Sequence, residues 1–193
     1  MVEIYRTDQQ VLSTLDDIQE GCWINMVDPT NKEIEQIAKR FEIEPEDIAS
    51  ALDEEESSRI SLEDGYTVIL VDIPTPEVRH EKKMYTTIPL GIILKSEAII
   101  TVCKIDTPII NYFVRNKVKE FSTKKKMRFI YQMLFRSAFV YQANLRLIDK
   151  KRIEIEERVD GDTSDTDLIE LHELESTLVY FATSPVSYTH LRA

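Results

Sequence analysis

The dipeptide Asp64-Gly65 lies between two runs that have the pattern of β-strands, and this arrangement strongly constrains the fold. The first run, Arg59 to Glu63, alternates in polarity, whereas the second, Tyr66 to Ile73, is almost continuously apolar. Asp-Gly at such a position is a strong signal for a β-hairpin, because both residues tolerate the φ angles of a tight turn. A strand that is apolar on both faces must be covered on both sides. The sequence therefore predicts a central sheet with helices packed on it.

Further strands are predicted on both sides of this hairpin from runs that are rich in apolar residues. They are Val2 to Arg6, Cys22 to Val27, Met84 to Leu94 and Ala98 to Cys103. The segment Val11 to Ile18 is interpreted differently, as a weak helix or an irregular turn.

Helices are predicted between and after these strands. Thr30 and Glu33 have the spacing of a capping box, in which each side chain accepts a hydrogen bond from the backbone amide of the other residue. A helix from about Asn31 to Phe41 therefore begins here. A second, short helix begins near Pro45, which suits a first turn because proline has no amide proton to leave unpaired. A third begins at Thr107-Pro108.

The longest predicted element is a helix from about Lys126 to Val159, which contains neither proline nor glycine. At 1.5 Å per residue it would run on the order of 50 Å. A last helix, capped by Ser164 or Thr166, follows and completes an antiparallel helical hairpin. The apolar positions expected to face inward are Met127, Ile130, Leu134, Ala138, Tyr141, Leu145 and Ile148 in the first helix, and Leu168, Leu171, Leu174, Leu178 and Phe181 in the second.

The length of 193 residues and the hydrophobic content of 42% are typical of one domain with a proper core. The predicted fold is a three-layer α/β/α sandwich with a central mixed or antiparallel sheet and a C-terminal hairpin of long helices. Cys22 and Cys103 lie in different predicted strands and form no C-x-x-C pair, so buried, reduced thiols are expected. The chain has no signal peptide and no apolar run near the ~20 residues of a membrane helix, so a soluble chain is expected.

The charge balance argues against a nucleic-acid partner. Lys and Arg number 24 and Asp and Glu 35, which gives a net charge of -11. A surface this acidic repels phosphate backbones and attracts cations. Acidic solubility without any specific site is the alternative interpretation.

The densest acidic run, Asp53 to Glu56, is the candidate metal site. Magnesium and calcium prefer oxygen ligands, which clustered carboxylates supply. Adjacent side chains point in different directions, however, so they cannot all reach one ion. Asp53 and Glu54 are the candidate ligands, and a solvated helix end is the alternative.

Other chemical motifs are incomplete or missing. The acidic residues Asp160, Asp162, Asp165 and Asp167 do not fit an EF-hand, which needs glycine and glutamate where this chain has Asp165 and Leu171. The histidines, His80, His172 and His190, form no H-E-x-x-H motif. The sequence has no P-loop, G-x-G-x-x-G or G-x-S-x-G motif either, so neither an enzyme activity nor a cofactor is predicted.

A basic patch precedes and includes the start of the long helix. Its members are Lys117, Lys119, Lys124, Lys125, Lys126 and Arg128. Binding of anionic lipid headgroups is one interpretation. Salt bridges to acidic helices of the same or an adjacent copy explain the patch equally well.

Several segments occur in an order and spacing that resemble those of one transporter family. They are Trp23 to Thr30, Ala51 to Arg59, Val71 to Pro74, Thr87 to Gly91 and Ile99 to Cys103. The chain resembles the CorA-like magnesium and cobalt transporters, most closely the branch common in Gram-positive bacteria. The resemblance implies the N-terminal domain, at the cytoplasmic face of the cell membrane, of a pentameric divalent-cation channel. Its implied partners are its own membrane domain and sister subunits, with Mg²⁺ as the regulatory and transported ion.

The resemblance covers residues 1–183 and implies a domain truncated before the stalk helix and the membrane helices. The family's Gly-Met-Asn pore signature is absent. Residues 184–193 lose the helical period at Pro185 and do not resemble the family. They are interpreted as a foreign or disordered tail, with a native extension as the alternative.

The regulatory carboxylates of the family do not transfer directly. Matching positions places the first near Ser50, which is not a carboxylate, and the second beyond the end of the chain. Asp53 or Glu54, about one turn further on, is the hypothetical substitute. The resemblance thus implies a regulatory domain that contributes to ion sensing and gating, and the alternative is a free-standing soluble metal-binding or interaction module.

Overall fold

The computed structural model describes residues 1–9, 11–79, 82–159 and 165–183. These residues form a seven-stranded sheet in the order β2-β1-β3-β7-β6-β5-β4. The strands are β1 (Val2–Asp8), β2 (Val11–Leu15), β3 (Cys22–Val27), β4 (Arg59–Glu63), β5 (Tyr66–Arg79), β6 (Lys82–Leu94) and β7 (Ala98–Cys103). The helices are α1 (Asn31–Phe41), α2 (Pro45–Ala49), the short 3-10 helix η1 (Ser50–Leu52), α3 (Pro108–Val114), α4 (Lys126–Val159) and α5 (Asp165–Thr183).

The predicted hairpin is formed by β4 and β5. Glu63 pairs with Tyr66 across the Asp64-Gly65 turn, and Gly65 has a φ angle of 81°. A positive φ suits glycine because it has no Cβ to clash with the backbone. The strands β3 and β7 run parallel, whereas the other paired strands are antiparallel. The sheet is therefore mixed.

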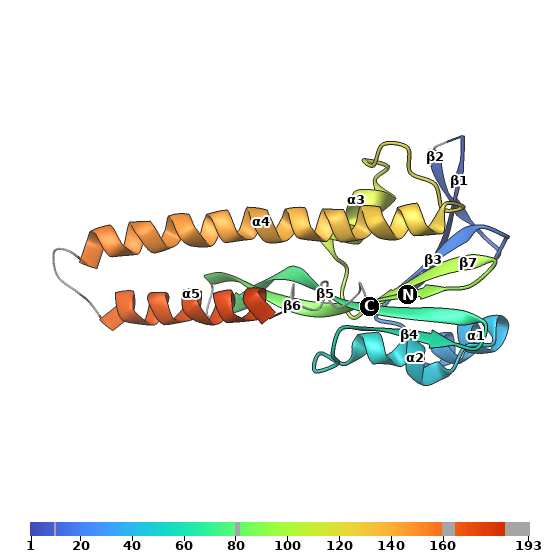
Figure 1. Cartoon of the computed structure of the whole chain (residues 1–193), viewed down its shortest axis with the longest axis horizontal. Coiled ribbons are helices and arrows are strands. Elements are labelled where there is room, and N and C mark those ends of the chain that lie inside the picture. Colours follow the sequence, from blue (N-terminus) through green and yellow to red (C-terminus); the bar gives the residue numbers. More distant parts are fainter. Residues whose placement is uncertain (10, 80–81, 160–164, 184–193) are drawn as a thin grey trace.

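Helices cover both faces of this sheet, as predicted (Figure 1). On one face α1, α2 and η1 bury Ile37, Phe41 and Ile48 against inward residues of the strands. On the other face, α3 and the first part of α4 bury Phe113 and Phe129. The strands β5 to β7 are apolar on both faces because each face has its own helical layer. The predicted three-layer α/β/α sandwich is confirmed.

The start of α1 confirms the predicted capping box. Thr30 Oγ1 accepts a hydrogen bond from the Glu33 amide at 3.3 Å, and Glu33 Oε2 accepts one from the Thr30 amide at 2.8 Å. These bonds satisfy amides that the first turn of a helix leaves without intrahelical partners. The helix therefore begins at Asn31 as the sequence indicates.

The second half of α4 forms a separate layer with α5 and the extended ends of β5 and β6 (Figure 1). Tyr141 and Phe181 meet edge to face with ring centroids 5.1 Å apart. The Tyr141 hydroxyl donates a hydrogen bond to the Asp72 carbonyl oxygen at 3.1 Å, which joins α4 to β5. The predicted helical hairpin is thus anchored to the sheet at one end.

Several local predictions were wrong. The segment predicted as a weak helix or turn contains a strand, β2, which pairs with β1 so that Asp8 lies opposite Val11. The predicted inward face of α4 is confirmed at Ile130, Tyr141 and Ile148, which are buried, and wrong at Met127, Ala138 and Leu145, which are exposed. Phe129 and Met133 are buried instead. The reason is that the α3 and β-strand surfaces, and not the helix's own apolar period, decide which side of α4 is covered.

The predicted inward face of α5 was also partly wrong. Leu174 and Phe181 are buried, as expected, and Leu171 packs partly against them. Leu168 and Leu178 are exposed instead. In the part of the chain that the structure describes, the main contacts of α5 are with α4 and β6, so a narrow stripe of its surface is covered.

Candidate functional site

The acidic run begins directly after η1, where the chain turns toward β4. Asp53 is the C-terminal cap residue of η1, and its Oδ1 accepts a hydrogen bond from the Glu55 amide at 3.0 Å. Its side chain is exposed. This hydrogen bond stabilises the local turn.

Glu54 points to a different neighbour. Its Oε1 accepts a hydrogen bond from Lys104 Nζ at 2.8 Å, and both side chains are exposed. Lys104 follows β7, so this ion pair links the acidic run to the end of a central strand. The hydrogen bond to Glu54 and its negative charge raise the pKa of Lys104 above its ordinary value.

Glu56 makes a third, separate interaction. It forms an ion pair with Arg59 at the start of β4, and its Oε1 accepts a hydrogen bond from the Ser57 amide at 3.2 Å. The carboxylates of the run therefore diverge, as expected for adjacent residues. In the described part of the chain, no group of three or more His, Cys, Asp or Glu side chains is placed to hold a metal ion.

Ser50, near which the family resemblance places the first regulatory carboxylate, has a structural role here. Its hydroxyl donates a hydrogen bond to the Asp47 carbonyl oxygen at 2.9 Å. The Asp47 carboxylate in turn accepts a hydrogen bond from the Tyr66 hydroxyl at 2.7 Å. Burial, followed by the bond to Asp47, raises the pKa of Tyr66 to about 12. This network ties α2 to β5.

The remaining sequence candidates are the histidines and the acidic residues between and within the two long helices. Asp160 and Asp162 lie outside the described residues, as do His80 and His190. Asp165 is the first residue of α5. His172 is exposed on α5, with its Nδ1 3.7 Å from Glu175 Oε2.

The basic patch divides between the loop before α4 and its first turn. Arg128 forms an ion pair with Glu120, which lowers the pKa of that carboxyl group. Lys126 Nζ donates hydrogen bonds to the carbonyl oxygens of Lys95, at 2.6 Å, and Ser96. These contacts agree in part with the salt-bridge interpretation, because Arg128 is paired within the same chain.

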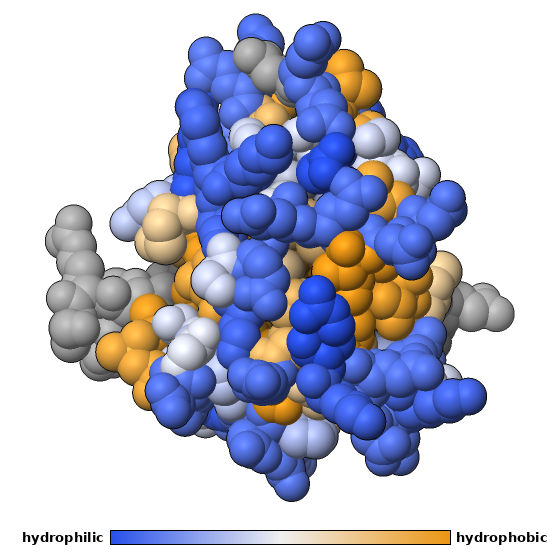
Figure 2. Space-filling model, turned by 90° about the vertical axis from the view of Figure 1, so that its right-hand side faces the viewer, coloured by the Kyte–Doolittle hydropathy of each residue, from blue (hydrophilic) through white to orange (hydrophobic). Residues whose placement is uncertain are grey.

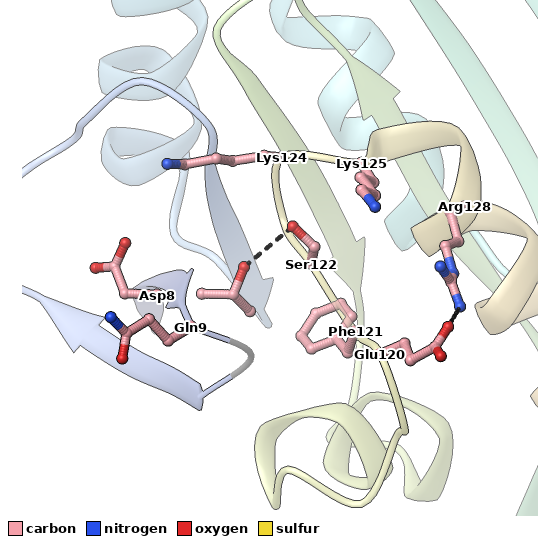
Figure 3. Close-up of a pocket in the computed structure, with 9 residues that line it drawn as sticks. Asp8, Gln9, Glu120, Phe121, Ser122, Lys124, Lys125 and Arg128 are labelled. Atoms are coloured by element: carbon pink, nitrogen blue, oxygen red, sulfur yellow. Dashed lines mark hydrogen bonds and ion pairs between the residues drawn. The ribbon is translucent and has the colours of Figure 1, made fainter.

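A cavity of about 480 Å³ opens beside this patch, and the sequence reasoning missed it. Its walls come from the end of β1 and from the loop that leads into α4 (Figure 3). The lining residues are Thr7, Asp8, Gln9, Glu120, Phe121, Ser122, Lys124, Lys125 and Arg128. Hydrophilic side chains cover most of this end of the molecule (Figure 2). The lining segments lie more than a hundred residues apart in sequence, so no local motif could have indicated the cavity.

Among the residues that the structure describes, no helix is both long and apolar enough to cross a membrane. The long helix α4 carries charged side chains along its exposed side, including the ion pair between Arg152 and Asp149.

These features define the class of protein to which the chain belongs. A mixed sheet between two helical layers, extended by a hairpin of long helices, is the fold of the soluble domains of CorA-type transporters. The family described as CorA-like Mg²⁺ transporter protein matches residues 19–190. The chain therefore belongs to the CorA-like Mg²⁺ transporter family.

Solved structures show the same fold at low sequence identity. The complete CorA magnesium transporter from Methanocaldococcus jannaschii is 21% identical with a TM-score of 0.82, and the match covers 97% of this chain and 60% of that chain. The soluble domain of the same transporter gives a TM-score of 0.83 at 21% identity, with coverage of 97% and 76%. The ZntB cytoplasmic domain from Vibrio parahaemolyticus matches at 0.63 and 11% identity, with coverage of 93% and 72%. A search of curated proteins finds no significant match.

Proposed function

We propose that this chain is the cytoplasmic regulatory domain of a CorA-like divalent-cation transporter or channel and contributes to ion sensing and gating. The observation that carries the proposal is the family match over residues 19–190. Mg²⁺ is the proposed regulatory and transported ion, with Co²⁺ as a second cargo. In the whole protein, the chain would act with its own membrane domain and with sister subunits in a pentamer. Residues 1–183 form the proposed domain, and residues 184–193 lie outside it.

Asp53 and Glu54 are the proposed ligands for the regulatory ion. Both are exposed, and each has one carboxylate oxygen engaged, by the Glu55 amide and by Lys104 respectively. Mg²⁺ binds through one or two carboxylates and keeps several of its waters. A site with so few protein ligands is consistent with the open geometry of this run.

The proposed mechanism requires a second copy of the chain. The described residues of one copy do not gather three ligands at one point, so a tightly held ion needs carboxylates from a neighbour. Such an ion binds the assembled copies better than the separate ones. A difference in affinity between two states is what allows an ion to shift the balance between them.

The test is a thermal melt and a light-scattering mass of the purified chain, with and without millimolar Mg²⁺ and with NaCl at matched ionic strength. A ligand that binds only the folded state raises the melting temperature by mass action. We expect Mg²⁺ to raise both the melting temperature and the mass. We expect the variant Asp53→Asn/Glu54→Gln to lose both effects.

A matched control variant is Glu35→Gln/Glu46→Gln, which removes two exposed carboxylates from α1 and α2. It should respond to Mg²⁺ as the parent chain does. An equal loss in both variants would mean that Mg²⁺ acts through general charge and would contradict the assigned ligands. A rise in melting temperature without a change in mass would favour the free-standing metal-binding module.

A further inference from the structure

Cations accumulate where the long helix α4 begins. The segment 124–128 reads Lys-Lys-Lys-Met-Arg, and the first turn of α4 contains no acidic residue. The N-terminus of a helix carries a partial positive charge, so cations at this end are unfavourable unless an anion compensates them. In a chain with a net charge of -11, this local excess of positive charge is unusual.

Only part of this charge is compensated within the chain. Arg128 is paired with Glu120, and the Lys126 ammonium group donates to two carbonyl oxygens. Lys124 and Lys125 are exposed, and within the described residues neither ammonium group has an ion-pair partner. The Lys124 side chain passes close to Gly21, since a Cβ added to that glycine would lie 2.8 Å from Lys124 Cγ.

Lys124 and Lys125 line the 480 Å³ cavity, and the segment that carries them is fixed to β1 and to the core. Thr7 and Thr123 are buried and exchange hydrogen bonds: the Thr7 amide donates to Thr123 Oγ1 at 3.2 Å, and the Thr123 amide donates to Thr7 Oγ1 at 2.9 Å. Phe121 is fully buried, with its ring centroid 4.6 Å from that of Phe129. A wall fixed in this way needs little ordering when a ligand binds.

The two carboxylates that line the cavity already face cations. Asp8 Oδ2 is 3.0 Å from Arg6, and Glu120 is paired with Arg128. The Ser122 hydroxyl, 3.4 Å from Thr7 Oγ1, adds a polar group between the two walls (Figure 3). The unpaired ammonium groups of Lys124 and Lys125 therefore set the sign of the charge that the cavity prefers.

We propose that this cavity binds a small, soluble phosphate-bearing anion, with Lys124 and Lys125 as its charge partners and Ser122 as a hydrogen-bond partner. Lysine is a common phosphate ligand because its ammonium group acts as a strong point charge. The volume lies within the range of about 300–1,000 Å³ that is usual for small-molecule sites. The site is separate from the proposed Mg²⁺ ligands, so either proposal can fail without the other.

The test is calorimetric titration of the purified chain with inorganic pyrophosphate at constant ionic strength. We expect saturable binding that the variant Lys124→Gln/Lys125→Gln weakens by about tenfold or more, because it removes both charged hydrogen-bond partners of the anion. The control variant Lys117→Gln/Lys119→Gln removes the same charge from exposed lysines of the same patch outside the cavity. It should bind pyrophosphate as the parent chain does.

Two results would overturn the proposal. One is the absence of saturable pyrophosphate binding, and the other is an equal loss of affinity in the two variants. Vesicles that contain phosphatidic acid distinguish the possible sources of the phosphate group. If the parent chain sediments with these vesicles through Lys124 and Lys125 but does not bind pyrophosphate, the ligand is a lipid headgroup and the assignment to a soluble anion is wrong.

Discussion

The indole Nε1 of Trp23 donates a hydrogen bond to Thr101 Oγ1 at 2.8 Å, inside the core between the parallel strands β3 and β7. Both side chains have no exposed surface. The Thr101 hydroxyl in turn donates to Asn25 Oδ1 at 2.9 Å. One hydroxyl group therefore satisfies two buried polar groups on the neighbouring strand, and its loss would leave both without this partner.

Thr101→Val keeps the shape of the side chain but removes this hydroxyl. We expect it to lower the free energy of unfolding by about 2–4 kcal/mol, because a buried polar group left unpaired costs about 1–3 kcal/mol. Thr101→Ser is the control: it keeps the hydroxyl and loses one methyl group, worth about 1 kcal/mol. Urea unfolding followed by the fluorescence of Trp23, the single tryptophan, measures both. A smaller loss of unfolding free energy in Thr101→Val than in Thr101→Ser would contradict the role of the hydrogen bond.

The close contact between β6 and η1 predicts a strong effect of Gly91→Ala. A Cβ at Gly91 would lie 2.6 Å from the Ala51 Cβ, closer than two carbon atoms can approach. Overpacking of this kind costs about 1–3 kcal/mol. Ala51→Gly removes the opposing methyl group, so the double variant should be more stable than Gly91→Ala alone. Chemical unfolding of the two single variants and the double variant forms a double-mutant cycle. If the two single losses of unfolding free energy add up in the double variant, the contact is refuted.

The capping box predicts acid sensitivity of α1. Hydrogen bonds from the Thr30 amide and hydroxyl lower the pKa of Glu33. The ionised carboxylate therefore contributes stability above its unfolded-state pKa, and this contribution is lost as the pH falls through the lower, folded-state pKa. Thr30→Ala should cost about 1 kcal/mol at neutral pH. Glu33→Gln should reduce the fall in melting temperature between neutral and acidic pH, which is called the acid limb below.

Thermal melts of these variants from neutral to acidic pH test this prediction. Glu35→Gln is the matched control, since Glu35 is an exposed residue of the same helix and has no cap contact. It should leave the acid limb unchanged. An acid limb that is identical in the parent chain and in Glu33→Gln would show that the capping box does not produce the pH dependence.

The buried thiols should react slowly in the folded chain. Burial raises the pKa of Cys103 from 9.0 to about 11, and burial also raises the pKa of Cys22. The Cys103 thiol therefore stays protonated in the folded state, and its contribution to stability is lost as the pH rises from about 9 to about 11. At pH 8 the folded chain therefore has much less Cys103 thiolate than the unfolded chain.

Reaction with a thiol-specific disulfide reagent measures this difference. Both thiols should react at once in guanidinium chloride and much more slowly in the folded chain. Cys22→Ala isolates the reaction of Cys103, and Cys103→Ala isolates that of Cys22. Rapid modification of either thiol in a chain shown to be folded would contradict the burial of these strands.

The acidic run illustrates how far the candidate site could be predicted. The sequence indicated that adjacent carboxylates cannot share one ion, and in the structure Asp53, Glu54 and Glu56 do contact different partners. The sequence could not indicate the ion pair between Glu54 and Lys104, because that contact depends on how β7 lies beside η1. The assignment of Asp53 and Glu54 as metal ligands stays a prediction.

Local hydrogen bonds and periodicity determined much of the fold from the sequence alone. The capping box at Thr30, the turn at Gly65 and the proline-free run from Lys126 to Val159 each depend on residues close in the chain, and these predictions are confirmed. The family resemblance also rested on segments whose order and spacing are visible in the sequence.

Tertiary structure alone decided which surfaces are covered. Phe121 lies among the lysines of the basic patch, yet it is fully buried because Trp23, Phe113 and Phe129 converge around it. The burial of Phe129 and Met133 on α4 and the cavity beside Thr7 likewise depend on contacts between residues far apart in sequence. A local pattern states which residues can share a face. Only the packing of distant elements determines whether that face meets the core, a ligand or solvent.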